Sequence, residues 1–288
     1  MDEQNNGPKP PTVRFKLEAV LAGARSTPPL AGNEMSDSDQ IASLIESARD
    51  AHARGDFVLA LALCAEAITI SPTNFKARFM RALVNQATQN HTDAIAEFTD
   101  ILAASDRAPV TTAALYSRAV SHHAMGRIDN AAADCRAALE IDADHFDARY
   151  LHCITLKAMG EIEQAIAEAT RLIDARPNYN EAIYTRATLR HMNADWSGSV
   201  DDFTMYLQNT GTSGEFQHTA YFFRGVSYHC LNANDKALAD LNRALTLQPD
   251  NATALARRAL VYSALGQAEE SAADIQRSKD LLNAKNAS

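Results

Sequence analysis

The stretch "SRAVSHHAMGRIDNAAADCRAALE", Ser117 to Glu140, contains two alanine-rich segments on either side of the short sequence "MGR". Ala119 and Ala131 are small residues in segments that otherwise favour helix, and Gly126 lies between the segments. Glycine readily adopts the positive φ with which many helices end. The stretch therefore predicts two short helices that are joined by a tight turn and that pack closely where the small residues face each other.

The same arrangement recurs along the chain in units of 34 residues. When each unit is numbered from 1, position 8 is always small: it holds Ala48, Ala82, Ala119, Cys153, Ala187, Gly225 and Ala259. Position 20 is small as well: it holds Ala60, Ala94, Ala131, Ala165, Ser199, Ala237 and Ser271. We therefore predict about seven helix–turn–helix repeats, which start near residues 41, 75, 112, 146, 180, 218 and 252.

This unit resembles the tetratricopeptide repeat. The resemblance rests on the small residues at positions 8 and 20, on a mostly apolar position 24, and on proline at position 32 in several units (Pro72, Pro177 and Pro249). It covers about residues 41–285, although the usual tryptophan at position 4 is missing. The resemblance implies an all-α fold, an α-solenoid in which helix pairs stack into a right-handed superhelix and the first helix of each pair lines a concave groove. Stacking buries an apolar core that a single pair cannot form.

Outside the repeats, residues 1–40 are rich in proline and polar side chains, which predicts a mostly disordered N-terminal segment. Within it, residues 13–25 place Val13, Leu17, Val20, Leu21 and Ala24 on one helical face. This short amphipathic helix is either a docking element for another protein, a segment that lies on the solenoid, or a transient helix without a role. At the other end of the solenoid, which we place at 41–288, the polar sequence after residue 275 predicts a C-terminal capping helix.

Two columns of opposite charge accompany the repeat in units two to seven. Position 7 holds Arg81, Arg118, His152, Arg186, Arg224 and Arg258, and position 23 holds Glu97, Asp134, Glu168, Asp202, Asp240 and Asp274. The first unit has Ser47 and Leu63 instead. Because the basic and acidic residues are present together and absent together, we predict ion pairs between the two helices of a pair or across the next interface. A row of arginines that binds an acidic ligand is the alternative.

The candidate partner-binding residues lie at positions that face the concave side in the resembling family. They are the aromatic residues Phe79, Tyr116, Tyr150, Tyr184 and Phe222 at position 5, and His123, Lys157, His191 and His229 at position 12. Aromatic residues at position 5 are also consistent with ordinary packing inside each repeat. Since histidine gains its charge near pH 6.5, we expect binding at this wall to change between pH 7.5 and 5.5.

Composition and motifs exclude several classes of function. The net charge of −9 argues against a nucleic-acid partner. We expect no membrane association, because no apolar run reaches the roughly 20 residues that span a bilayer. The sequence has no phosphate loop, GxSxG or HExxH motif, so we predict that the protein is not an enzyme and needs no cofactor. Histidines on helices roughly 8–10 Å apart are too far from one another to complete a metal site.

Four cysteines without CxxC spacing indicate reduced thiols and a cytoplasmic location. Cys64, Cys135 and Cys153 occupy packing positions of the repeat, which predicts buried and unreactive thiols. The sequence as a whole predicts a non-enzymatic adaptor that binds a peptide or helix of another protein in the concave groove, with residues 13–25 as a second contact. The alternatives are a structural subunit of a larger cytoskeletal or ciliary assembly, or a co-chaperone. No register reproduces the family's clamp for a C-terminal carboxylate.

Overall fold

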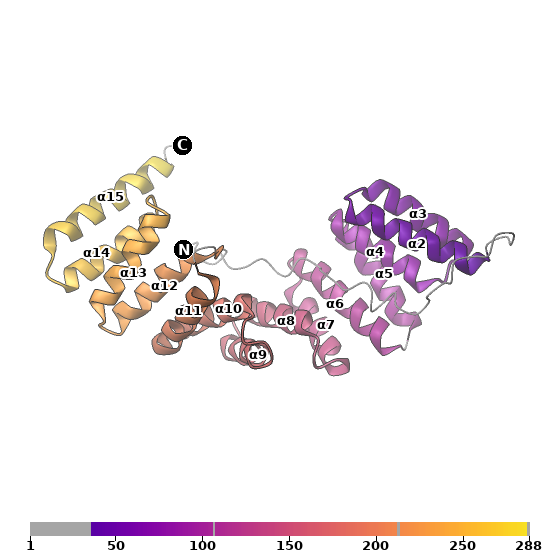
Figure 1. Ribbon diagram of the computed structural model, residues 1–288, viewed down its shortest axis with the longest axis horizontal. Coiled ribbons are helices and arrows are strands. Elements are labelled where there is room, and N and C mark those ends of the chain that lie inside the picture. Colours follow the sequence, from indigo (N-terminus) through magenta and orange to yellow (C-terminus); the bar gives the residue numbers. More distant parts are fainter. Residues whose placement is uncertain (1–35, 106, 212–213, 287–288) are drawn as a thin grey trace. The chain divides into compact units, whose positions relative to one another are not determined.

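The computed structural model describes residues 36–105, 107–211 and 214–286, and every regular element within them is an α-helix (Figure 1). The prediction of an all-α solenoid of helix–turn–helix pairs is therefore confirmed. The amphipathic helix predicted at 13–25 lies outside the described residues. The described part divides into two compact units between Met159 and Gly160, inside the fourth predicted repeat.

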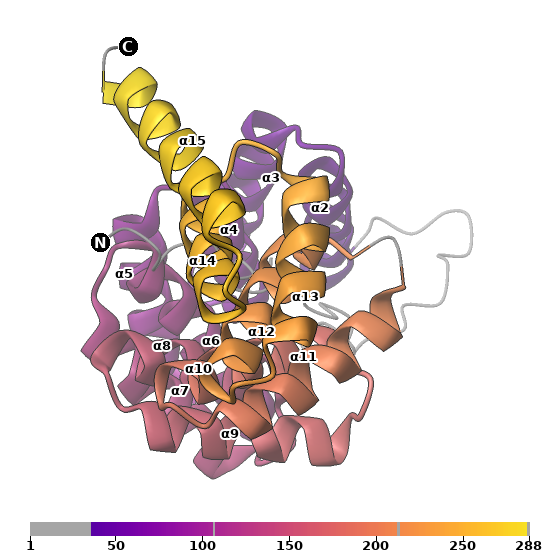
Figure 2. The ribbon, with the colours of Figure 1, turned by 90° about the vertical axis from the view of Figure 1, so that its left-hand side faces the viewer.

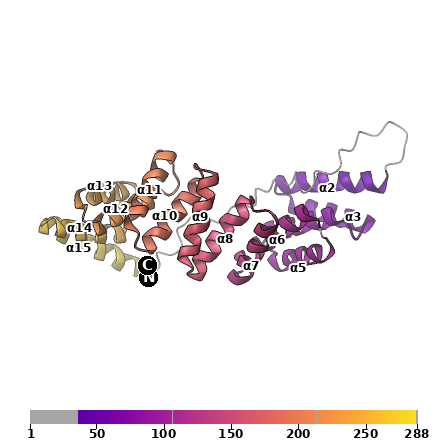
Figure 3. The same cartoon turned by 90° about the horizontal axis from the view of Figure 1, so that it is seen from below.

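In the first compact unit, residues 36–159, each helix contacts the next one along the chain, and the first helices of successive pairs also contact one another. Figure 3 shows this stacking from α2 onward. The helices are α2 (Asp37–Ala53), α3 (Phe57–Ile70), α4 (Phe75–Ala87), α5 (His91–Ala104), α6 (Ala108–Ala124), α7 (Ile128–Ile141) and α8 (Phe146–Met159).

The second unit repeats the same arrangement, with α10, α12 and α14 in contact with one another as first helices. Its helices are α9 (Ile162–Ala175), α10 (Asn180–Met192), α11 (Trp196–Thr210), α12 (Gln217–Cys230), α13 (Asn234–Leu247), α14 (Ala252–Ala264) and α15 (Ala268–Asn286).

The start of the first helix differs from the sequence prediction. Helix α2 begins at Asp37, four residues before the predicted start of the first repeat, because the Ser36 hydroxyl accepts a hydrogen bond from the Asp39 amide and caps the helix. At the other end, the second helix of the last pair, α15, is one continuous helix of 19 residues. It extends past the first residues of α14, where the Ser278 hydroxyl donates to the Ala252 carbonyl oxygen (Figure 2).

The small columns hold the two helices of a pair close together in the six pairs that lie within one unit. The alanines at positions 8 and 20, such as Ala119 and Ala131, have essentially no exposed surface. At Gly225, a Cβ atom would lie 3.0 Å from Leu241 Cγ and 3.3 Å from the Ala237 carbonyl oxygen. A residue larger than alanine at these positions would therefore force the helices apart.

The turn inside each pair has one backbone conformation in all seven repeats. Position 15 has positive φ whether the residue is glycine or not: the values are 77° for Gly55, 65° for Gln89, 71° for Gly126, 80° for Gly160, 57° for Ala194, 60° for Asn232 and 77° for Gly266. The positive φ predicted for the glycine of the turn is confirmed. The packing of the two helices imposes this conformation even where the side chain disfavours it.

Replacing Ala194 with glycine should raise the free energy of unfolding by about 1 kcal/mol, because alanine at positive φ is strained by about 1–2 kcal/mol and glycine regains most of that. The measurement is a thermal or urea melt of the full chain. Ala96→Gly, an exposed alanine inside α5, should instead lower stability by about 1 kcal/mol. Equal effects of the two substitutions would contradict the strain argument.

Candidate functional site

A row of partly to fully buried ion pairs joins the first and second helix of five repeats. The arginine at position 7 and the acid at position 23 pair within the same repeat, 16 residues apart, as Arg81–Glu97, Arg118–Asp134, Arg186–Asp202, Arg224–Asp240 and Arg258–Asp274. The four arginine–aspartate pairs are bidentate, with N–O distances of 2.6–2.9 Å. These contacts favour the ion-pair interpretation of the two columns and place the pairs within a repeat.

A third nitrogen of each of these four arginines reaches the preceding repeat. The acceptor is the side-chain oxygen at position 25 of the helix before, as in Arg118–Thr99, Arg186–Thr170, Arg224–Thr204 and Arg258–Asn242. One guanidinium therefore connects three helices. Sequence reasoning missed position 25, although its preference for threonine or asparagine behind an arginine is visible in the sequence.

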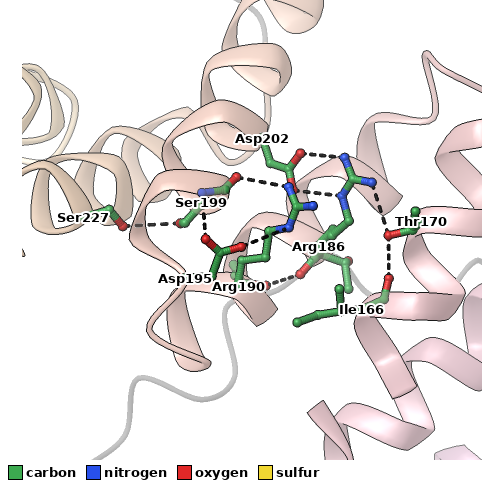
Figure 4. A network of polar contacts seen from close by, with 11 residues as sticks. Ile166, Thr170, Arg186, Arg190, Asp195, Ser199, Asp202 and Ser227 are labelled. Atoms are coloured by element: carbon green, nitrogen blue, oxygen red, sulfur yellow. Dashed lines mark hydrogen bonds and ion pairs between the residues drawn. The ribbon is translucent and has the colours of Figure 1, made fainter. Parts of the chain in front are cut away.

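The ion pair of the fifth repeat is the most deeply buried. Asp202 is 1% exposed, and it accepts hydrogen bonds from Arg186 Nε at 2.9 Å and from Arg190 Nη1 at 2.9 Å. Arg190 also lies 3.5 Å from the Asp195 carboxylate. Figure 4 shows both arginines converging on Asp202. With its charge and lone pairs engaged, this cluster is a structural element and offers no free group to a ligand.

The paired histidines of the sequence have separate environments. His122 is buried, and its Nε2 lies 3.9 Å from the Asp134 carboxylate. Burial lowers the pKa of His122 even though the Asp134 charge acts in the opposite direction. His123 is half-buried, and burial lowers its pKa as well. His122 therefore belongs to the interface between the two helices, and His123 to the surface of α6.

The structure places the five aromatic candidates at position 5 in the core. Phe79, Tyr116, Tyr150 and Tyr184 are each 1% exposed and Phe222 is 7% exposed. Phe79 meets Phe98, and Tyr184 meets Phe203, edge to face at centroid distances of 5.3 and 5.8 Å. In both cases the second ring is the position-24 residue of the same repeat. The rings thus serve the packing that the sequence left open as an alternative, and they do not line an open groove.

Two of the histidine candidates contact other helices: His191 contacts the turn of its own repeat and α12 of the next repeat, and His229 contacts the turn of its own repeat. His191 packs edge to face on Trp196 and Phe223, and its Nδ1 is 2.9 Å from the Ser227 hydroxyl. His229 Nδ1 is 2.8 Å from the Asn234 side-chain oxygen. Burial, together with the positive charge of Arg257, lowers the pKa of His191 to about 4. Burial thus moves the pKa of both His123 and His191 below the ordinary value of about 6.5 on which the expected change of binding with pH was based.

One part of the predicted wall remains available in the first unit. Helices α6 and α8 contact each other, and on the face of positions 9, 12 and 13 they present half-buried Val120, His123, Ile154 and Lys157 beside exposed Ala124 and Ala158. We call these six residues the α6–α8 wall. Exposed Met125 and Met159 lie at its edge.

Lys157 is the distinctive group of this wall. Burial lowers the pKa of the Lys157 ammonium group. Within the described residues, no carboxylate forms an ion pair with it. A half-buried ammonium group without a carboxylate partner is suited to an acidic or carbonyl group of a ligand. No three histidine, cysteine or acidic side chains of the described part gather as metal ligands.

The cysteines and the helix lengths add two further observations. Cys64, Cys135 and Cys153 are buried, Cys230 is exposed, and burial raises the pKa of the Cys64 thiol to about 11. Within the described residues, no helix combines the length and the hydropathy that crossing a bilayer requires.

Three family models match the sequence. Two models described as tetratricopeptide repeat match residues 76–146 and 122–188, and one described as TPR repeat matches residues 225–266. Together they cover more than half of the 288 residues. A search among curated proteins finds no match.

Solved structures of helical repeat proteins are similar in fold. A tetratricopeptide repeat protein from Parabacteroides merdae is 18% identical, with a TM-score of 0.59 over 84% of this chain and 93% of that chain. MamA is 16% identical, with a TM-score of 0.54 over 59% of this chain and 97% of that chain. MamA from Desulfovibrio magneticus, from residue 41 to its end, is 13% identical, with a TM-score of 0.57 over 60% and 96%. At these identities the likeness concerns the fold alone.

Replacing Asp202 with alanine should lower the free energy of unfolding by about 3–5 kcal/mol, because two arginines lose their buried counter-charge. Chemical denaturation of the full chain measures this loss. The neighbouring Asp201 is exposed, so Asp201→Ala should change stability by less than about 1 kcal/mol. A similarly small effect of Asp202→Ala would show that the row does not hold the helices together.

Stability should fall as the pH drops from about 6.5 to about 4. The unfolded chain binds a proton at His191 below its ordinary pKa of 6.5, whereas the folded chain resists protonation down to about 4. The loss from this residue is at most about 3 kcal/mol. In melts at pH 7 and pH 5, His191→Gln should flatten the dependence on pH, and Met192→Gln, at an exposed neighbouring position, should leave it unchanged.

Proposed function

This chain belongs to the tetratricopeptide repeat family, and from that premise we propose that it is a non-enzymatic interaction scaffold that binds a peptide or helix of another protein at the α6–α8 wall. The observation that carries the proposal is the half-buried ammonium group of Lys157 between apolar neighbours. Its surroundings disfavour the charge, as the lowered pKa indicates, and no acidic side chain of the described residues compensates it. A ligand carboxylate would stabilise that charge.

The shape of the wall supports a chain-like ligand. Val120 and Ile154 occupy equivalent positions on adjacent first helices, as do His123 and Lys157, so apolar and polar contacts recur once per repeat. Exposed Ala124 and Ala158 leave room for a backbone to approach. First helices are separated by roughly 8–10 Å, which is about the rise of three residues of extended chain or one and a half turns of helix. A ligand with an acidic residue and an apolar residue could therefore place the acid at His123 or Lys157 and the apolar side chain at Val120 or Ile154.

The buried aromatic residues then act indirectly. Tyr116 belongs to the core cluster beneath α6, where it packs with Ala119 and Leu151. It therefore supports the wall from behind, and the ligand contacts the residues one helical turn further along the same face. Of the candidate residues that the sequence predicted, His123 and Lys157 contact the ligand under this proposal. The five aromatic candidates keep the first helices in place: Phe79, Tyr116, Tyr150, Tyr184 and Phe222.

The test is a selection of peptides from a random displayed library against the immobilised full chain, followed by affinity measurements on the enriched peptides. We expect enrichment of peptides with an acidic residue beside apolar residues, and a rise in Kd of about tenfold, or 1.4 kcal/mol, with Lys157→Gln. Lys279→Gln, which neutralises an exposed lysine of α15, is the matched control and should leave Kd unchanged. Enriched peptides that bind Lys157→Gln and the unsubstituted chain equally well would place the binding surface elsewhere.

A further inference from the structure

The second helix of the first repeat, α3, differs from the second helices of all the later repeats on its outer face. Its sequence "FVLALALCAEAITI" contains a single charged residue, Glu66. Ala60, Cys64 and Ala67 are fully buried against the rest of the unit, yet the opposite face is also apolar along most of its length, before exposed Glu66 and Thr69 near the C-terminal end. Val58 is 82% exposed and Leu59 41% exposed, with exposed Ala62 and Ala65 on the next turns.

The later repeats provide an internal comparison. At position 18, where the first repeat has Val58, they have Thr92, Asp129, Glu163, Ser197, Asp235 and Glu269. At position 19, where the first repeat has Leu59, they have Asp93, Asn130, Gln164, Gly198, Lys236 and Glu270. The repeat itself therefore does not require apolar residues at these two positions. An exposed valine and an exposed leucine there indicate a face that another segment covers.

We propose that residues 13–25 of this same chain cover the outer face of α3 as a helix. The apolar residues Val13, Leu17, Val20 and Leu21 would pack on Val58, Leu59, Ala62 and Ala65. A helix over 13–25 would be about 20 Å long, which matches the 14 residues of α3. The sequence pattern thus supplies an apolar stripe of the right length for the apolar face that α3 exposes.

The connection is long enough for this contact. The described chain begins at Ser36, which caps α2, and α2 packs against α3 as the other helix of the same pair. Residues 26–35 can span up to about 33 Å, whereas one helix diameter is about 10 Å. The segment is therefore long enough to reach the outer face of α3 from the start of α2 without any rearrangement of the unit.

The charges of the two partners are complementary. Residues 13–25 carry Arg14, Lys16 and Arg25 against Glu18, for a net charge of +2. The hairpin of α2 and α3, residues 36–71, carries six acids against two arginines, for a net charge of −4. The opposite net charges of the two segments favour this occupant over a second copy of the same negatively charged hairpin.

The experiment is hydrogen–deuterium exchange of the full chain, read at the amides of residues 13–25. If the segment docks, these amides should exchange at least tenfold more slowly than in an unstructured peptide. Val58→Asp should abolish that protection, since an aspartate would have to be buried. The variant should still fold, because Val58 lies in the first turn of α3 and is largely exposed, and circular dichroism checks this.

Two further variants complete the test. Thr92→Asp places the same charge at the same position of the second repeat, on an exposed residue of α5, and should leave the protection intact. Leu17→Asp changes the other partner and should abolish it. Absence of protection in the unsubstituted chain, or protection that survives Val58→Asp, would overturn the proposal. A dimer by light scattering that becomes a monomer with Val58→Asp, while residues 13–25 stay unprotected, would assign the face to a second copy instead.

Discussion

The arrangement of the helices depends on burying a carboxylate at position 23 where two helices meet. An isolated acid there would be strongly unfavourable, and the arginine at position 7 makes it tolerable by binding both of its oxygens, as Arg186 does for Asp202. The third nitrogen of the guanidinium, Nη1, is not needed for this pair and donates to the Thr170 hydroxyl of α9. A single side chain thereby fixes the register of three helices, which apolar packing of many alanines alone would specify poorly.

The fold could be predicted from the sequence because its main constraint is steric and periodic. Small residues such as Ala119 and Ala131 recur at the same two positions, and the turn with positive φ follows from the spacing between them. The ion pairs could be predicted as well, because every repeat that has the basic residue at position 7 also has the acidic residue at position 23, and the first repeat has neither. The choice between pairing within a repeat and pairing across an interface could not be predicted, because sequence spacing does not say which of two neighbouring carboxylates an arginine faces. Position 25 was missed because Ala65 and Arg136, whose side chains cannot accept a hydrogen bond, interrupt its column of threonine and amide side chains.

The candidate site was predicted less well, for a physical reason. An aromatic residue such as Tyr184 on the inner face of a first helix serves equally as a ligand contact or as a partner for the ring at position 24. Only the tilt of the helix decides between the two roles, and here it turns the ring onto Phe203. The histidines are ambiguous in the same way, because the charge of His191 depends on Trp196, Phe223 and Arg257, which come from three other helices.

Each of the four bidentate arginines donates a hydrogen bond to a side chain that precedes it in the sequence, and this has a consequence for folding during synthesis. A ribosome makes the acceptors Thr204 and Asn242 before it makes Arg224 and Arg258. When a new hairpin emerges, the position-25 acceptor of its arginine has therefore already been synthesised. The acidic partner lies in the second helix of the same hairpin, so these polar contacts need no later part of the chain. Before the last hairpin is made, the polar group that waits for it is the neutral amide of Asn242, so no unpaired charge is exposed, although apolar residues such as Leu245 are covered only when α14 packs on them.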